Sequence, residues 1–176
     1  MIDSFLRFIE FEKRLSKHTV IADKTDLLQF QAFIKQTFEV NEPSAASYAM
    51  IRSWLAHLIE KKTEPRSVNR KIATLRAYFK FLLRQASIEK DPTLKIKVLK
   101  TQKRLPSFVR EEEMNNLLDR AIFDASLQSH RDKLILELFY GSGMRLAELL
   151  QLTDRAISFK SRTIKVLGKR NKERVI

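Results

Sequence analysis

The sequence has no cysteine, and its 176 residues include only three glycines and four prolines. Without cysteine the chain can form neither a disulfide framework nor a thiolate metal site. Its three histidines (His18, His57 and His130) are scattered and show no ligand spacing, so we expect no metal. Glycine and proline disfavour helices most strongly, and their scarcity therefore predicts a mostly helical protein.

Long apolar runs are also absent. No stretch approaches the roughly 18 consecutive apolar residues that a membrane span requires. The first residues, Met1–Ser4, lack the basic and apolar regions of a signal peptide. We therefore expect a cytoplasmic protein with no membrane partner, and the lack of cysteine suits a reducing compartment. The hydrophobic content of 44% is ample for a folded core.

Basic residues are in clear excess. Lysine and arginine number 34 against 21 acidic residues, which gives a formal charge of +13 and a pI of about 10.1. Such a balance is typical of a protein with a polyanionic partner, either nucleic acid or an anionic membrane surface. Between Arg66 and Arg104 lie twelve lysines or arginines and two acidic residues, so a net charge of +10 is concentrated there.

The four prolines divide the first part of the chain into helical segments, because proline rarely occurs inside a helix. Apolar periodicity predicts four amphipathic helices: roughly 3–15, one from residue 19 onward, one capped by Ser44 or Ser47, and roughly 67–85. In the first helix we expect Phe5, Phe8, Ile9 and Phe11 to face inward. Four such helices predict a small bundle.

The basic run after Pro92 indicates a change of domain. We predict a DNA-binding domain over 1–96, a basic linker over 97–106 and a second domain over 107–176. Ser107 is expected to cap the first helix of the second domain, with Glu111–Glu113 in its first turn.

Helices over roughly 129–140 and 145–152 and three short strands near 156–159, 163–167 and 173–176 complete a small α+β part. Because the last strand has no continuation, we expect this domain to be incomplete. Its open edge at Ile176 is expected to favour pairing with another strand.

The fourth helix has a basic face opposite its apolar stripe. The cations expected to contact DNA lie on this face and in the linker: Arg66, Arg70, Lys80, Arg84, Lys97, Lys100, Lys103 and Arg104. A helix buried on one side and basic on the other can lie against a duplex and replace its condensed counterions. An ordinary solvated face is the alternative. A membrane-surface helix is a weaker one, since a bundle core explains the apolar stripe better.

Two of the three glycines, Gly141 and Gly143, lie just before Arg145. The stretch is neither a phosphate-binding P-loop nor a dinucleotide fingerprint. It predicts a helix ended by glycine, a tight turn, and Arg145 at the start of the next helix, where donors converge on a phosphate. The third glycine opens Gly168–Lys172, a predicted hairpin turn with Lys169 and Lys172 at its tip.

These two motifs resemble those of the tyrosine recombinases, especially the bacterial Xer-type enzymes and phage integrases. Their pattern is an aromatic or aliphatic residue followed by Gly-x-Arg-x-Ser-Glu-Leu, then a hairpin with Gly-Lys-x-x-Lys-x-Arg. The helical first part is similar to the family's SAM-like core-binding domain, and Leu105-Pro106 to the start of its catalytic domain. The resemblance implies a four-helix core-binding bundle followed by the N-terminal half of an α+β catalytic domain.

The resemblance also implies roles for individual residues. Arg145 matches the first catalytic arginine, which contacts the scissile phosphate. Lys169 matches the hairpin lysine that protonates the leaving 5′-oxygen, and Glu148 matches the acid that supports the arginine. Ala147 departs from the usual serine. In the family a tyrosine attacks the phosphate and forms a 3′-phosphotyrosine, so neither metal nor cofactor is expected.

The family's nucleophilic tyrosine lies downstream of the hairpin, whereas Tyr48, Tyr78 and Tyr140 all lie upstream of it. We therefore expect this chain to bind double-stranded DNA, together with other recombinase protomers, and to be inactive alone in cleavage. The resemblance places DNA between the two domains, with the second and fourth helices at the major groove. A non-catalytic DNA-binding fragment that competes for recombination sites and a helical protein-interaction module are the alternatives.

Overall fold

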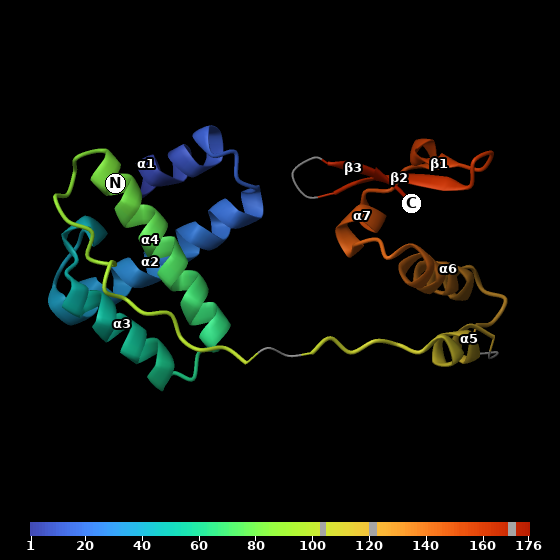
Figure 1. The fold of residues 1–176 in the computed structure, drawn as a ribbon, viewed down its shortest axis with the longest axis horizontal. Helices are drawn as coiled ribbons and strands as arrows, with labels where there is room; N and C mark the ends of the chain where they lie inside the picture. Colours follow the sequence, from blue (N-terminus) through green and yellow to red (C-terminus); the bar gives the residue numbers. More distant parts are fainter. Residues whose placement is uncertain (103–104, 120–122, 169–171) are drawn as a thin grey trace. The chain divides into compact units, whose positions relative to one another are not determined.

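The computed structural model describes residues 1–102, 105–119, 123–168 and 172–176 (Figure 1). It divides into two compact units, Met1–Arg104 (unit 1) and Leu105–Ile176 (unit 2), each of which is described by itself. The chain is mostly helical with one small sheet, which confirms the predicted fold class. No helix within the described ranges is both long and apolar enough to cross a membrane.

Unit 1 contains the four predicted helices: α1 (Ile2–Arg7), which continues into a π-helical turn at Phe8–Glu12, α2 (Lys17–Phe38), α3 (Tyr48–Glu60) and α4 (Pro65–Arg84). A 3₁₀ turn at Pro43–Ala45 lies between α2 and α3. Of the two candidate caps for α3, Ser47 is the correct one, since its Oγ accepts a hydrogen bond from the Met50 backbone N–H at 3.3 Å.

Aromatic side chains from all four helices form the core of unit 1. Phe5, Phe30, Trp54 and Tyr78 are fully or almost fully buried. The Phe5 and Tyr78 rings meet edge to face with centroids 5.5 Å apart, and the Phe30 and Trp54 centroids are 5.0 Å apart. Each such pair contributes about 0.5–1.5 kcal/mol beyond the buried area, so these contacts hold the bundle together.

The prediction that Phe11 belongs to the core is wrong. Phe11, which we expected to face inward, is 69% exposed. It lies in the π-helical turn that follows α1, where wider spacing replaces the 3.6-residue repeat on which the prediction depended. The chain then leaves the helix, so Phe11 points away from the core while Phe5 and Ile9 stay inside it.

After α4 the chain runs back along the same helix. Ile96 is buried in the core, and its carbonyl accepts a hydrogen bond from Arg76 Nη2 at 2.6 Å. Further along, the Asn69 side chain donates to the Leu99 carbonyl at 2.9 Å and accepts from the Leu99 N–H at 2.8 Å. Residues 97–99, at the start of the predicted linker, are therefore fastened to α4.

Unit 2 consists of α5 (Glu111–Asp119), α6 (Leu127–Ser142), α7 (Leu146–Leu150) and the strands β1 (Ile157–Ser158), β2 (Thr163–Leu167) and β3 (Glu173–Val175). The strands form an antiparallel sheet in the order β1-β2-β3, with Ile157 opposite Ile164 and Val166 opposite Arg174. The three strands lie where the sequence predicted them.

The expected cap of α5 is wrong. The helix begins at Glu111 and not directly after Ser107. The Glu113 carboxylate accepts a hydrogen bond from the Arg110 backbone N–H at 3.2 Å, so an acidic side chain of the first turn binds the residue that precedes the helix. The three glutamates of the first turn lie where we expected them.

The core of unit 2 is small. Among its described residues only Met114, Met144, Glu148 and Val166 are buried, and α6 contributes none. Several large apolar side chains of this unit are instead strongly exposed: Leu127, Leu146, Leu150 and Phe159. The local geometry of unit 2 therefore depends heavily on its polar contacts.

The aromatic core gives a test of the fold. We expect Phe5→Ala to lower the free energy of unfolding of unit 1 by about 3–5 kcal/mol, because it leaves a cavity beneath Tyr78 and Phe81. Urea titration followed by tryptophan fluorescence measures this unit alone, since Trp54 is the only tryptophan. The matched control Phe11→Ala should change stability by less than about 0.5 kcal/mol. Equal losses from the two variants would contradict the assigned core.

Candidate nucleic-acid interface

A basic stripe runs along the outer side of α4. Its four predicted DNA-contacting residues are all exposed: Arg66, Arg70, Lys80 and Arg84. At 3.6 residues per turn they fall within roughly 80° of arc, over a length of about 27 Å. Ala73 and Ala77 lie in the same sector between them and are also exposed. The stripe therefore has cations at both ends and small side chains in the middle.

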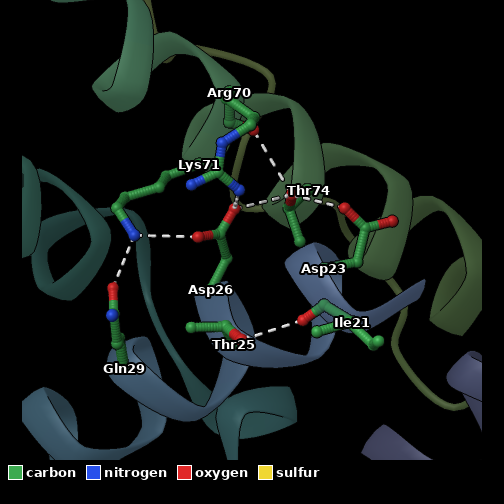
Figure 2. Close-up of polar contacts among 8 residues, drawn as sticks. All are labelled: Ile21, Asp23, Thr25, Asp26, Gln29, Arg70, Lys71 and Thr74. Atoms are coloured by element: carbon green, nitrogen blue, oxygen red, sulfur yellow. Dashed lines mark hydrogen bonds and ion pairs between the residues drawn. The ribbon is translucent and has the colours of Figure 1, made fainter. Parts of the chain in front are cut away.

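A buried carboxylate lies beneath this stripe (Figure 2). Asp26 on α2 is 1% exposed, and its two oxygens accept hydrogen bonds from Arg70 and Lys71 of α4, the latter at 2.8 Å. Thr74 donates to the same carboxylate at 3.1 Å. The side chain of Arg70 is nevertheless 48% exposed, so part of its guanidinium remains free for an external partner.

Lys71 belongs to the core and not to the basic surface. Its ammonium donates to Asp26 and to the Gln29 side-chain oxygen, and it lies 5.9 Å from the centre of the Trp54 ring. The charge count of the sequence could not distinguish this buried lysine from its exposed neighbours. Arg76 is likewise bonded internally, to the Ile96 carbonyl.

A second acid of α2 borders this cluster. Burial raises the pKa of Asp23, and the neighbouring charge of Asp26 raises it further, whereas the hydrogen bond from Thr74 at 2.9 Å and the charge of Arg70 lower it. Two acids and two bases thus face one another between α2 and α4 (Figure 2). The cluster ties the basic helix to its neighbour.

Two of the predicted linker cations can be placed. Lys97 and Lys100 are exposed, and Lys100 lines a hollow of about 420 Å³ together with Arg66 at the start of α4. The structure thus brings one linker cation beside the basic stripe. Lys103 and Arg104 lie outside the described residues.

In unit 2 the turn between α6 and α7 presents Arg145. Helix α6 ends at Ser142, and Gly143 follows in the left-handed conformation with φ of 59°, which a residue with a side chain adopts at a cost. Its N–H donates to the Phe139 carbonyl at 3.0 Å. Arg145 is the N-cap of α7, and its side chain is 64% exposed. The glycine-ended helix followed by an arginine is as the motif predicted.

Glu148 holds this arginine in place. Its carboxylate is buried, with the residue 4% exposed. Oε2 accepts the Arg145 backbone N–H at 2.8 Å, and Oε1 accepts Arg145 Nη1 at 2.8 Å. The backbone hydrogen bond is the main cause that lowers the pKa of Glu148, and the guanidiniums of Arg145 and Arg174 lower it further. The acid is therefore ionised beside Arg145.

Arg174 is a member of the site that the sequence reasoning missed. From β3 it donates Nη2 to Glu148 Oε2 at 2.8 Å and to the Gly143 carbonyl at 3.4 Å, and its side chain is 42% exposed. Arg174 is the last residue of the Gly-Lys-x-x-Lys-x-Arg pattern, and this position could have indicated that it belongs to the site. Its partner Glu148, 26 positions earlier, could not be identified from local sequence patterns.

The base of the hairpin lies close to the same carboxylate. A Cβ at Gly168 would be 3.3 Å from Glu148 Oε1, so glycine permits a close approach here. The Gly168 N–H donates to the Lys172 carbonyl at 2.7 Å, and Lys172 is exposed. The predicted general acid, Lys169, lies outside the described residues.

The site can hold a phosphate between exposed guanidiniums, whose N–H groups match phosphate oxygens.

Within the described part of the chain no group of three or more histidine, aspartate or glutamate side chains is placed to hold a metal ion. Tyr78 is fully buried, and burial raises its pKa to about 12, so this tyrosine is neither accessible nor easily ionised.

Residues 2–86 match the family model described as the N-terminal SAM-like domain of phage integrases, and residues 107–176 match the phage integrase family model. The two matches occupy the two units in turn. The chain belongs to the tyrosine recombinase (phage integrase) family.

Within this family the sequence is similar to the Xer recombinases. It is 35% identical over 175 residues to tyrosine recombinase XerC of Halalkalibacterium halodurans, which covers 99% of this chain and 57% of that protein. It is 34% identical over 176 residues to XerD of Staphylococcus haemolyticus, which covers 100% of this chain and 59% of that protein. The chain thus spans less than two thirds of the length of these relatives.

Solved structures show the same fold. A lambda integrase dimer bound to a COC′ core site matches with a TM-score of 0.74 at 15% identity, over 99% of this chain and 47% of that one. The integrase of mycobacterium phage Brujita matches with a TM-score of 0.54 at 24% identity, over 100% of this chain and 56% of that one.

The buried cluster predicts a strong effect on stability. Asp26→Ala leaves Lys71 buried without its carboxylate partner, and we expect it to lower the free energy of unfolding of unit 1 by about 3–5 kcal/mol. Trp54 fluorescence in urea measures the loss. The control Glu60→Ala, at an exposed acid of α3, should change stability by less than about 0.5 kcal/mol. A loss from Asp26→Ala as small as that of the control would show that the ion pair is dispensable.

Proposed function

We propose that this chain binds double-stranded DNA as the core-binding domain and the first part of the catalytic domain of a Xer-type site-specific recombinase. The observation that carries the proposal is the basic stripe of α4. It lies opposite a fully formed core and its four cations are exposed, Arg70 with 48% of its side chain accessible beside Asp26, so they can contact phosphates.

The shape of the stripe suits a groove. The major groove of B-DNA is about 12 Å wide and admits an α-helix. Exposed alanines at positions 73 and 77 let the middle of α4 approach the base edges closely, while Arg66 and Arg84 at its two ends reach the flanking phosphates. We place α4, with α2 beside it, against the major groove.

The arginine of unit 2 supplies a second contact. Arg145 binds the scissile phosphate, supported by Glu148, and stabilises the charge that develops on its oxygens. Lys169 serves as the general acid for the leaving 5′-oxygen. In the complete recombinase a tyrosine attacks the phosphate and forms a 3′-phosphotyrosine, with no cofactor required. The chain by itself binds DNA but does not cleave it, since none of its three tyrosines matches that nucleophile.

The wider assignments follow from the same proposal. Residues 1–96 act as the core-binding domain, 97–106 as a basic linker and 107–176 as the first part of the catalytic domain. Other recombinase protomers are partners on DNA, in keeping with lambda integrase, which has been solved as a dimer on a core site and as a tetramer on a Holliday junction. We assign the chain to the cytoplasm.

Salt dependence tests the proposal directly. We expect the chain to bind a random-sequence duplex at low salt, with an affinity that falls linearly on a log–log plot as salt rises, because phosphate contacts release counterions. Removing one contact, as in Lys80→Ala, should reduce the magnitude of the slope by about 0.9. Fluorescence anisotropy of a labelled duplex measures both quantities.

Lys61→Ala, at an exposed lysine after α3, is the matched control and should leave the slope unchanged. Absence of binding at low salt, or binding insensitive to salt, would contradict the proposal and favour a helical protein-interaction module. If the chain inhibited recombination by an intact Xer recombinase at the recombination site of that enzyme, the result would favour the alternative of a competing DNA-binding fragment.

A further inference from the structure

We propose that Arg174 is a positioning residue for the phosphate contact of Arg145. Arg174 binds Oε2 of Glu148, so that only Oε1 accepts an N–H from the Arg145 guanidinium. The remaining N–H groups of that guanidinium are left for DNA. The inference rests on the proposed function, because it assigns Arg174 a role at the same phosphate site. Three observations within unit 2 support it.

The first is the way in which the Glu148 oxygens are occupied. Oε1 accepts Arg145 Nη1, while Oε2 accepts both the Arg145 backbone N–H and Arg174 Nη2, each at 2.8 Å. A carboxylate oxygen has two lone pairs, so these two donors fill Oε2. Arg145 consequently cannot form the two parallel bonds of a bidentate pair with Glu148. Among the residues that the structure describes, Glu148 takes one of the five N–H donors of the Arg145 guanidinium, which leaves four for a phosphate.

The second observation is that both arms of the β2–β3 hairpin meet the same carboxylate. Gly168 follows β2 and approaches Glu148 Oε1 so closely that a Cβ would lie 3.3 Å from it. Arg174 on β3 reaches Oε2 from the other arm and also donates to the Gly143 carbonyl in the turn before Arg145. Arg174 therefore joins the hairpin to the turn that presents Arg145.

The third observation is electrostatic. Glu148 is buried and ionised, and it faces two arginines that are both partly exposed. With both present the group has a net charge of +1. Without Arg174 one lone pair of Oε2 becomes free, Arg145 can pair with Glu148 through both nitrogens, and the group becomes neutral. Loss of Arg174 thus withdraws Arg145 from the phosphate in addition to removing one charge.

The test is a double-mutant cycle on duplex affinity of the full chain at low salt, with Arg145→Ala, Arg174→Ala and the double variant. We expect Arg174→Ala to weaken binding about tenfold, equivalent to about 1.4 kcal/mol. In the Arg174→Ala background, Arg145→Ala should then weaken binding by less than about twofold, because residues that act as a unit are not additive. Lys165→Ala is the matched control, since it removes a cation of the same sheet that pairs with Glu173 and not with Glu148.

A second readout needs no DNA. The NMR signal of the Arg145 side-chain Nε–H should shift in Arg174→Ala and stay unchanged in Lys165→Ala, while the amide signals of β2 show that the sheet is intact. If the alanine variant loosens the sheet, Arg174→Lys replaces it. Lysine can keep one N–H on Oε2, so the effect of Arg145→Ala on affinity should persist at its wild-type size.

Either of two results would overturn the inference: additive effects of Arg145→Ala and Arg174→Ala, or an Arg174→Ala affinity equal to that of Lys165→Ala. Failure of the wild-type chain to bind duplex at all would instead overturn the proposed function. In that case the NMR shift still decides whether Arg174 controls the pairing of Arg145 with Glu148.

Discussion

Each unit contains one buried carboxylate that determines where its neighbouring basic side chains lie. Asp26 and Glu148 are almost completely buried, and a buried charge is strongly unfavourable unless it is paired and hydrogen-bonded. Each acid meets this requirement with two basic side chains, at least one of them supplied by another element. In each pair an arginine expected to contact DNA, Arg70 or Arg145, keeps a large part of its surface exposed. The need to neutralise the acid thus fixes arginines at the surface of a folded unit.

The two units differ in how far hydrophobic packing contributes to the position of these arginines. In unit 1 the polar cluster adds to a continuous aromatic core, so the position of α4 is determined by packing as well as by Asp26. In unit 2 the buried apolar side chains are few, and Glu148 is itself one of the buried residues. The turn that holds Arg145 is therefore more dependent on hydrogen bonds than on hydrophobic burial.

The sequence predicted what depends on local periodicity and on motifs. The helices of unit 1, the three strands and the glycine-ended turn before Arg145 lie where expected, because apolar spacing and turn residues act over a few positions. Prediction failed at Phe11, where a π-helical turn changes the repeat, and at Ser107, where a glutamate inside the helix takes over the capping. It also could not reveal which cations are internal, since the partner of Lys71 lies 45 positions away. Such pairings depend on tertiary packing, which periodicity does not encode.

The double hydrogen bond between Asn69 and Leu99 has a consequence for avidity. By fastening the chain to α4 up to Leu99, it shortens the connection between the two parts that we propose to contact DNA to the residues after Leu99. When one part is bound, the local concentration of the other near the same duplex depends on the length of this tether, and a shorter tether raises it as long as it can span the two sites. One amide side chain on a core helix thereby helps to set how strongly two weak contacts reinforce each other.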